Sequence, residues 1–403
     1  MKKTTSILFT AKRPDIVMEK GRGMYLWDTD GHKYLDFIGG WAVTSLGHCP
    51  DVVRDALLSQ SKTLVNASPA FYNAPMLSFA DLLTRLSGFD RVFFASSGAE
   101  ANESAVKLAR KYGAKQKNGA YEIITTINSF HGRTLAMMSA SGKKIWESLF
   151  EPKVEGFIHV PFNDFEAVKA AVTEKTCAIM LEPVQGEGGV YPATTEYLTA
   201  LRSLCDEQGI LLIYDEIQTG IGRTGKMFAF EHSGIRPDIM TLAKGIGGGY
   251  PLSAMLTTAA LDIFEPGDQG GSYCAQPLGM AVGEAVVTEI AEGGWVENAR
   301  EMGDYLRELL GALGKELGET ADGTPYIRNI RGLGLLVAFD LPTANGADVV
   351  QYALTKGLLI NAAQPGTIRF MPPLIASRND MDAMIKILRH VLIKCSQPAD
   401  AAT

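Results

Sequence analysis

Cysteine is scarce in this sequence, and its spacing carries no pattern. The 403 residues include five cysteines, an odd number, at positions 49, 177, 205, 274 and 395, and they form no Cys-x-x-Cys pair. Scattered cysteines of this kind are typical of reduced thiols in the cytoplasm and argue against a disulfide framework. The six histidines show no metal-ligand spacing either. We therefore expect a cytoplasmic protein with no metal site.

The sequence also lacks a long apolar run and an excess of positive charge. It contains no stretch of about 18 apolar residues, so no membrane span is expected. The apolar run at residues 7–9 is too short for a signal peptide. A formal net charge of −7 argues against binding to a phosphate backbone as the main role. We expect neither a membrane nor a nucleic acid as a partner.

The composition that remains is ordinary for a globular protein, with 46% hydrophobic and 21% charged residues. A chain of 403 residues is too long for one simple core, which favours two domains. From residue 91 onward, strand patterns alternate with helical patterns, which predicts an α/β fold with a mainly parallel sheet and right-handed crossovers. Near the end of the chain, residues 331–339 and 367–370 are each predicted to form a strand.

Two apolar runs are each followed by an ionisable residue that could take part in catalysis. Residues 210–214 have no polar alternation, which indicates a strand buried on both faces of a parallel sheet, and Asp215 follows directly. Residues 238–243 form a second run that leads into Lys244. Ligands of open α/β sheets bind at the carboxyl ends of strands. A desolvated lysine there has a lowered pKa and can attack a carbonyl carbon. Taken alone, the aspartate would more often be a helix cap and the lysine a solvated loop residue.

Four short motifs decide between these interpretations. Residues 215–220 (DEIQTG), 222–225 (GRTG), 237–239 (PDI) and 243–245 (AKG) resemble, in order and spacing, the signature of the class III aminotransferases. These are pyridoxal-phosphate enzymes of fold type I. The resemblance extends over nearly the whole chain, and within the class it is strongest to the acetylornithine aminotransferases.

The resemblance implies both a fold and an assembly. It predicts a large cofactor-binding domain at residues 51–295, with a mainly parallel seven-stranded sheet flanked by helices. A small α+β domain would combine residues 1–50 with residues 296–403. The implied assembly is a homodimer with its active site at the subunit interface.

A turn before a long helix is the predicted phosphate site. Ser97, Gly98 and Ala99 precede a helical pattern that starts near Glu100, and the free amides of a helix N-terminus bind anions. Alone, this pattern would more often be a simple helix cap. The resemblance implies that these three residues hold the phosphate of pyridoxal 5′-phosphate. It also implies that the hydroxyl of Ser272 reaches the phosphate of the partner subunit's cofactor.

The resemblance assigns the remaining cofactor contacts residue by residue. Lys244 would bond covalently to the cofactor aldehyde, and Asp215 would face the ring nitrogen, so these two residues are the predicted catalytic pair. Phe130 and Ile217 would pack on opposite faces of the ring, where stacking of an aromatic side chain adds about 1 kcal/mol beyond burial. Gln218 would hydrogen-bond to the phenolic oxygen of the ring.

Substrate binding is assigned to two arginines and one glutamate. Arg133 and Arg369 are the implied carboxylate-binding residues, a task that suits the planar donors of arginine. Glu187 is implied as a gate that pairs with an active-site arginine and releases it when a dicarboxylate arrives. Without the resemblance, Arg369 would be read as an exposed residue, and Glu187 with Glu182 as a general acid/base pair.

The predicted reaction is transfer of the terminal amine of an N-acetylornithine-like donor to 2-oxoglutarate. It gives a semialdehyde and glutamate by a ping-pong mechanism. A transaminase acting on 4-aminobutyrate or another ω-amino acid or diamine is the alternative. A racemase or aminomutase, and a non-catalytic cofactor-binding protein, also fit the fold. The glycine run at residues 245–249 could indicate a nucleotide site, but it lacks the phosphate-loop pattern.

Overall fold

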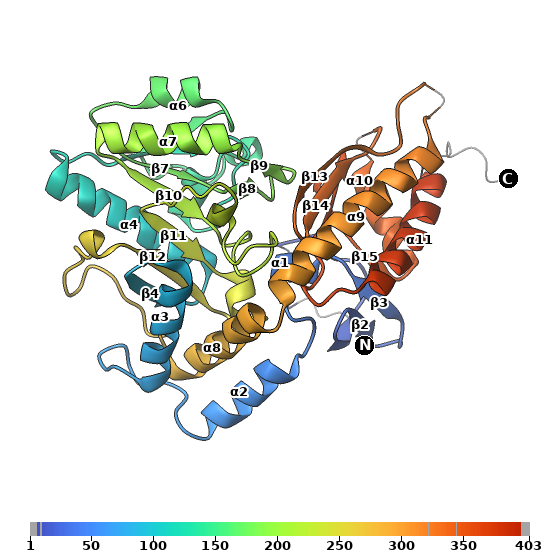
Figure 1. Cartoon of the computed structure of the whole chain (residues 1–403), viewed down its shortest axis with the longest axis horizontal. Coiled ribbons are helices and arrows are strands. Elements are labelled where there is room, and N and C mark those ends of the chain that lie inside the picture. Colours follow the sequence, from blue (N-terminus) through green and yellow to red (C-terminus); the bar gives the residue numbers. More distant parts are fainter. Residues whose placement is uncertain (1–5, 9, 321, 344, 396–403) are drawn as a thin grey trace.

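The computed structural model describes residues 6–8, 10–320, 322–343 and 345–395, which form two lobes (Figure 1). The larger lobe is built around one wide sheet, and the smaller one combines strands from the start of the chain with helices from its end. Helix α8 (Pro277–Glu292) leads from the large lobe toward α9 (Trp295–Leu317) of the small lobe. The predicted domain boundaries stay a prediction, and their outer ends lie outside the described residues.

The large lobe contains the predicted seven-stranded sheet. From edge to edge its strands are β4 (Arg91–Ala95), β12 (Ser253–Thr257), β11 (Ile239–Leu242), β10 (Leu211–Asp215), β7 (Thr176–Leu181), β5 (Glu122–Thr126) and β6 (Phe157–Val160). The pairs from β11 to β6 are parallel, whereas β12 runs antiparallel to both of its neighbours. The prediction of a mainly parallel sheet in an α/β fold is confirmed.

Helices cover both faces of this sheet, which explains why its strands read as continuous apolar runs. Along β7, Met180 packs with the helices of one face and Ile179 with those of the other. The first face carries α4 (Gly98–Gln116) and α5 (Leu135–Ala140); the second carries α6 (Phe165–Ala171) and α7 (Thr195–Gln208). Because both faces are dry, polar side chains are confined to the strand ends.

The small lobe contains two four-stranded sheets and three helices. One sheet has the order β1 (Met18–Arg22), β2 (Tyr25–Asp28), β3 (Lys33–Asp36) and β15 (Leu358–Leu359), and the other β13 (Arg328–Leu333), β14 (Leu336–Asp340), β17 (Thr367–Phe370) and β16 (Asn361–Gln364). Its helices are α9, α10 (Gly346–Thr355) and α11 (Arg378–Cys395). Since β15 pairs with β3, segments from both ends of the chain share one sheet.

The prediction of a single strand at residues 331–339 is wrong. The chain reverses there and forms the antiparallel hairpin of β13 and β14. Gly334 has φ +51°, a left-handed conformation that favours glycine. A Cβ at Gly334 would lie 2.3 Å from the carbonyl carbon of Thr224 in the large lobe. The turn is therefore set by a close contact between the lobes, which no strand pattern reveals.

The other elements are short, apart from α2 and α3. They are α1 (Gly39–Ala42), α2 (Asp51–Ser61), α3 (Ala74–Ser87), the two-stranded pair β8 (Val184–Gln185) and β9 (Tyr191–Pro192), and four 3₁₀ turns: η1 (Lys144–Trp146), η2 (Ala229–His232), η3 (Lys244–Gly247) and η4 (Ala259–Leu261). All five cysteines are free thiols. Among the helices of the described chain, none has the length and apolarity that crossing a membrane requires. The cytoplasmic location stays a prediction.

Candidate active site

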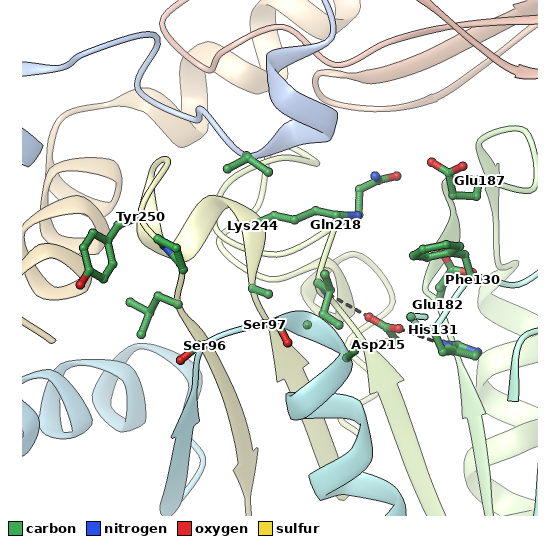
Figure 2. Close-up of a pocket in the computed structure, with 18 of the residues that line it drawn as sticks. Ser96, Ser97, Phe130, His131, Glu182, Glu187, Asp215, Gln218, Lys244 and Tyr250 are labelled. Atoms are coloured by element: carbon green, nitrogen blue, oxygen red, sulfur yellow. Dashed lines mark hydrogen bonds and ion pairs between the residues drawn. The ribbon is translucent and has the colours of Figure 1, made fainter. Parts of the chain in front are cut away.

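A cavity of about 350 Å³ lies at the carboxyl ends of the central strands. Its volume is in the range of small-molecule sites in proteins. The wall includes nine of the residues predicted from sequence: Ser97, Gly98, Ala99, Phe130, Glu187, Asp215, Ile217, Gln218 and Lys244 (Figure 2). Segments separated by more than a hundred residues thus converge on one site.

Lys244 is the first residue of η3, directly beyond β11. Its backbone has φ +46°, a left-handed conformation that is strained for a side chain of this size. In Figure 2 the side chain extends into the cavity. Burial lowers the pKa of the Lys244 amine, and the nearby carboxylates of Glu187 and Asp215 oppose that shift. A lysine with a lowered pKa has a free amine that can attack a carbonyl carbon.

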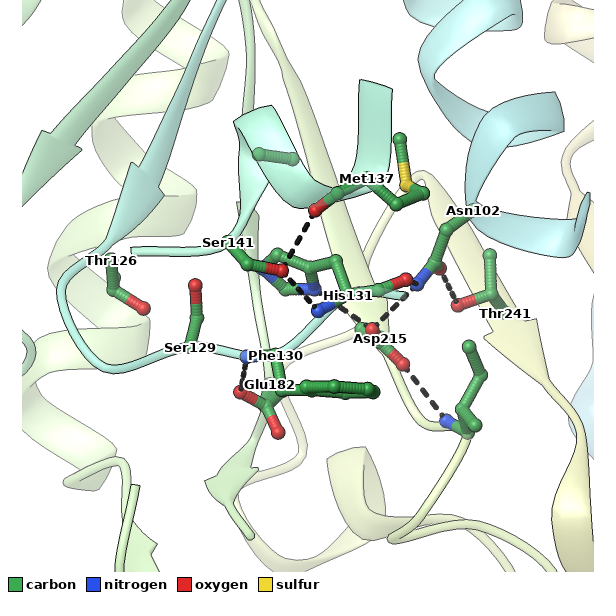
Figure 3. A network of polar contacts seen from close by, with 12 residues as sticks. Asn102, Thr126, Ser129, Phe130, His131, Met137, Ser141, Glu182, Asp215 and Thr241 are labelled. Atoms are coloured by element: carbon green, nitrogen blue, oxygen red, sulfur yellow. Dashed lines mark hydrogen bonds and ion pairs between the residues drawn. The ribbon is translucent and has the colours of Figure 1, made fainter. Parts of the chain in front are cut away.

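Asp215 is held by a network of buried polar side chains (Figure 3). Its Oδ2 accepts hydrogen bonds from Asn102 Nδ2 at 2.7 Å and from His131 Nδ1 at 2.8 Å. Its Oδ1 accepts from the Ile217 amide at 3.1 Å. The Thr241 hydroxyl donates to Asn102 Oδ1 at 2.7 Å and so fixes the orientation of that amide. The carboxylate is therefore oriented before any ligand binds.

The sequence did not assign a function to Asn102, His131 or Thr241. His131 follows Phe130 directly, and Asn102 is a fully buried amide in the helix after the predicted phosphate turn. Thr241 is the register partner of Asp215 on the neighbouring strand. A polar residue close in sequence to a predicted site residue is the signal that could have pointed to Asn102 and His131. Buried polar groups need hydrogen-bond partners, and the site supplies them.

The turn before α4 has the geometry of an anion site. Ser97 is the N-cap of this 19-residue helix, and its hydroxyl donates to Glu100 Oε2 at 2.8 Å. Gly98 has no room for a side chain, because a Cβ would lie 2.8 Å from Ile217 Cδ1. The free amides of the first helical turn can therefore hold a phosphate at the edge of the cavity.

The middle of the cavity suits a flat ring with polar substituents. Phe130 and Ile217 both line it, and the Phe130 amide donates to Glu182 Oε2 at 3.1 Å. Burial raises the pKa of Glu182 to about 7. Within the described structure, Gln218 Nε2 is buried and has no hydrogen-bond partner, so it is a donor available to a ligand. The donors, the apolar walls and the lysine together fit pyridoxal phosphate.

Glu187 lines the cavity and forms an ion pair with Arg369, which is fully buried. Arg369 Nη2 lies 2.6 Å from Glu187 Oε1, and Arg369 also donates to Asn361 Oδ1 and to Gln218 Oε1. Burial is the largest single influence and would raise the pKa of Glu187. The charge and hydrogen bond of Arg369, together with the charges of Lys143 and Lys244, outweigh it, and the pKa is lowered. Lys143 Nζ lies 3.6 Å from the second carboxylate oxygen of Glu187, a contact that the sequence did not predict.

Three predicted residues are not among the residues that line the cavity. Arg369 is one of them: it is fully buried and pairs with Glu187, which does line the cavity. Arg133 is exposed and is not part of the cavity wall that the structure describes. Ser272 is exposed in the loop before α8. That loop is tied to the segment before α3, because Asn73 Nδ2 donates to the carbonyl of Ala275 at 2.9 Å. The predicted contacts of Arg133 with substrate and of Ser272 with a partner's cofactor stay predictions.

Comparisons with known proteins agree with this geometry. The model of the family described as aminotransferase class-III matches residues 9–392. The chain is 49% identical over 394 residues to acetylornithine aminotransferase of Ralstonia nicotianae, covering 96% of this chain and 97% of that protein. It is also 49% identical over 393 residues to acetylornithine aminotransferase 2 of Bordetella bronchiseptica, covering 97% of each.

Solved structures give the same picture for the fold. Ornithine aminotransferase of Toxoplasma gondii superposes with a TM-score of 0.90 at 31% identity, covering 96% of this chain and 93% of that one. Acetylornithine aminotransferase of Elizabethkingia anophelis superposes with a TM-score of 0.83 at 30% identity, covering 96% of each chain. Both similarities extend over both lobes, since almost the whole chain is covered.

Proposed function

The chain belongs to the class-III aminotransferases, whose cofactor is pyridoxal 5′-phosphate, and we propose that it transfers the terminal amine of an N-acetylornithine-like donor to 2-oxoglutarate. The products are a semialdehyde and glutamate, formed in two half-reactions that share one site. The observation that supports this function best is the ion pair of Arg369 with Glu187, a residue in the wall of the cavity that Lys244 enters. Arg369 is a cation that can bind the carboxylate of an acceptor. Glu187 neutralises its charge when no acceptor is bound.

Each proposed cofactor-binding residue has a separate role. When bound, pyridoxal phosphate supplies an electron sink that stabilises the negative charge left by removal of a proton from the substrate carbon. The Asp215 carboxylate, oriented by Asn102 and His131, stabilises positive charge on the ring nitrogen. Phe130 and Ile217 hold the two faces of the ring. The amides of the α4 N-terminus hold the phosphate, and Gln218 donates to the phenolic oxygen.

Lys244 is the proposed acid and base. Its lowered pKa favours a neutral amine, which is the form that can accept a proton. With the cofactor bound, Nζ would take the proton from the substrate carbon that bears the amine, hold it, and give it up again to complete the half-reaction.

Glu187 and Arg369 are the proposed discriminating pair for the two substrates. A donor whose reacting end carries no second carboxylate binds while the pair is closed, so neither charge is left unpaired. A dicarboxylate acceptor displaces Glu187 and takes the Arg369 fork for its own carboxylate. One site can therefore accept two substrates of different charge, which a ping-pong mechanism needs.

We further propose that two copies of the chain form a dimer with shared active sites. The segment between α2 and α3 exposes large apolar side chains, among them Phe71 and Tyr72. The loop that carries Ser272 is bonded to this segment through Asn73. A partner that covered the apolar segment would therefore meet Ser272 close to the same surface.

A donor panel tests the proposed function. Purified protein with pyridoxal phosphate and 2-oxoglutarate is given N-acetylornithine, ornithine or 4-aminobutyrate, and glutamate is measured. We expect the largest kcat/KM with N-acetylornithine and no glutamate from the Lys244→Ala protein. Lys226→Ala, which changes an exposed lysine, is the matched control. Reaction with 4-aminobutyrate but not with N-acetylornithine would move the chain to the alternative donor class. Racemisation without glutamate formation would contradict amino transfer altogether.

A further inference from the structure

The Glu187 carboxylate contacts two cations, one on each oxygen. Oε1 lies 2.6 Å from Arg369 Nη2, and Oε2 lies 3.6 Å from Lys143 Nζ. Arg369 comes from β17 in the small lobe, whereas Lys143 comes from the segment between α5 and η1 in the large lobe. One carboxylate thus bridges two positive charges that belong to different lobes.

The position of Lys143 is defined by aromatic side chains. Its Nζ lies 4.9 Å from the ring centroid of Phe130 and 5.4 Å from that of Trp146. Such contacts with ring faces stabilise a cation and reduce its freedom. Only 19% of the Lys143 side chain is exposed, against 25% for Glu187 and none for Arg369. The three charges therefore form a largely dry cluster, in which each one needs a partner.

Separating Arg369 from Glu187, which opens the proposed gate, costs free energy because the carboxylate loses its partner. Lys143 can reduce this cost. When Arg369 turns to the carboxylate of an acceptor, Glu187 loses its 2.6 Å partner while it stays mostly buried. A buried carboxylate left without a partner is strongly destabilising. Lys143 already lies beside the other oxygen and keeps a positive charge next to Glu187. Phe130 and Trp146 hold that charge in place while Arg369 moves.

We propose that Lys143 is a positioning residue of the gate, which holds Glu187 after Arg369 has been released to a dicarboxylate acceptor. The proposal rests on the proposed function, because it needs Glu187 and Arg369 to act as the gate. Lys143 then favours the open gate without contacting either substrate. Affinity for a ligand that needs the open gate falls in proportion to the population of that state. Removing the Lys143 charge should therefore weaken acceptor binding and leave donor binding unchanged.

The test compares three variants of the holoenzyme by calorimetric titration. Lys143→Met keeps the length of the side chain and removes its charge, Lys143→Arg keeps the charge, and Lys144→Met changes the exposed neighbouring lysine. The ligands are glutarate, a dicarboxylate that cannot react, and butyrate, which has one carboxylate. We expect Lys143→Met to bind glutarate roughly tenfold more weakly, equal to about 1.4 kcal/mol. Glutarate affinity of the other two variants should stay within about twofold of wild type, as should butyrate affinity of all three.

Kinetics give an independent measurement of the same effect. In the Lys143→Met enzyme the KM for 2-oxoglutarate should rise by the same factor, and the KM for the donor should not change. A normal donor half-reaction also shows that the variant has folded and has bound its cofactor. A rise in both KM values would mean a general disturbance of the site and would overturn the proposal.

A double-mutant cycle separates an action through Glu187 from direct contact with the ligand. In Glu187→Gln the gate is gone, so Lys143→Met should have no further effect on glutarate affinity. An equal loss of affinity in the Glu187→Gln background would mean that Lys143 binds the ligand itself, and would overturn the proposal. So would unchanged glutarate binding by the single Lys143→Met variant. If wild-type protein neither bound glutarate nor reacted with 2-oxoglutarate, the proposed function itself would fail first.

Discussion

At the scale of single residues, the proposed role of Asp215 depends on the orientation of its carboxylate as much as on its charge. Its Oδ2 accepts from Asn102 and His131, whereas Oδ1 accepts only from the Ile217 amide among the described residues, and the residue lines the cavity. Preorganised charges of this kind act without a cost of reorganisation at the moment of reaction. The side chain can therefore stabilise a cationic ring nitrogen more strongly than a mobile carboxylate could.

Asp215→Asn should lower kcat by a factor on the order of a hundred or more, since the shape is kept and the charge is lost. The cofactor should still be bound, because the phosphate site and Lys244 are unchanged. Stopped-flow measurement of each half-reaction, together with the visible absorbance of the bound cofactor, checks both statements. Asp206→Asn changes a surface aspartate that pairs with Arg202 and serves as the control. A variant with wild-type rates would show that Asp215 does not act on the ring.

Asn102→Ala should have a smaller effect on the rate, about tenfold in kcat, because Asp215 keeps its contacts with His131 and Ile217. It should also reduce the free energy of unfolding by about 1–3 kcal/mol, since the buried Thr241 hydroxyl loses its acceptor. Denaturant unfolding and steady-state kinetics measure the two effects separately. Loss of stability with no loss of rate would mean that Asn102 supports the fold but not the orientation of Asp215.

The sequence located the proposed catalytic side chains better than the residues that hold them. Lys244 and Asp215 follow apolar runs and lie in short motifs, so a local pattern is enough to find them. Asn102 and His131 are 113 and 84 residues away from Asp215 in the chain, and their contacts with it arise only when strands and helix come together. No local pattern carries that information.

At the scale of elements, helix α4 serves both ends of the site. Its first turn presents Ser97 and Gly98 to the phosphate position, and about one turn later Asn102 reaches Asp215. Residues four positions apart lie on the same face of a helix, so Gly98 and Asn102 are both directed at the cavity side. One rigid element would therefore set the distance between the proposed phosphate site and the proposed ring-nitrogen site.

The loop after β10 is anchored by a buried carboxylate. Glu216 Oε2 accepts from the Ala229 amide at 2.6 Å, and Oε1 accepts from the Phe230 amide at 2.8 Å, so Glu216 holds η2 against the strand end. Burial raises the pKa of Glu216 from 4.5 to about 7. A raised folded-state pKa means that the folded protein binds the proton more tightly than the unfolded chain does. Its contribution to stability is full below the unfolded-state pKa and is lost as the pH rises through about 7.

Glu216→Gln removes this titration, which gives a prediction with a definite sign. Between pH 6 and pH 8 the free energy of unfolding of wild type should fall by about 1 kcal/mol relative to that of the variant. Urea unfolding at the two pH values measures the difference, and all other groups titrate equally in both proteins. Glu207→Gln changes an exposed glutamate of α7 and shows the effect of the substitution outside the buried site. A constant difference between wild type and Glu216→Gln would contradict a raised pKa.

Elements could be predicted where a single local pattern decides them. The strand β10 was found because its apolar run is continuous, and a sheet covered on both faces produces such runs. The hairpin of β13 and β14 was missed because its apolar residues continue through the turn. What reverses the chain there is the contact of Gly334 with the large lobe, a property of the assembled fold.

At the scale of the whole molecule, the site joins the two lobes. Arg369 belongs to the small lobe and Glu187 to the large one, so the gate crosses the boundary between them. The fully buried Arg223 makes a second link, since its Nη1 donates to the carbonyls of Leu335 and Pro372 in the small lobe. Burial lowers the pKa of Arg223 to about 9. The relative position of the lobes therefore sets the geometry of the Glu187–Arg369 ion pair.

The segment between α2 and α3 exposes large apolar side chains, which leads to a prediction about the dimer. Phe71 is 70% exposed and Tyr72 is 84% exposed, an unfavourable arrangement for large apolar side chains unless another surface covers them. We expect a dimer, and we expect Phe71→Glu with Tyr72→Glu to weaken it by at least roughly thirtyfold, as loss of an interface hot spot does. Sedimentation velocity over a concentration series measures this, and Met18→Glu, on the exposed first strand of the small lobe, is the control.

The same variant tests whether the dimer completes the active site. The loop that carries Ser272 is bonded to the apolar segment through Asn73 and Ala275, so separating the subunits would remove the Ser272 hydroxyl from the partner's phosphate site. We therefore expect the dissociated variant to lose pyridoxal phosphate on dialysis more rapidly than wild type. Ser272→Ala should lose it faster as well, but should remain dimeric. A monomer that kept its cofactor and its full rate would refute shared active sites, and a variant that stayed dimeric would place the interface elsewhere.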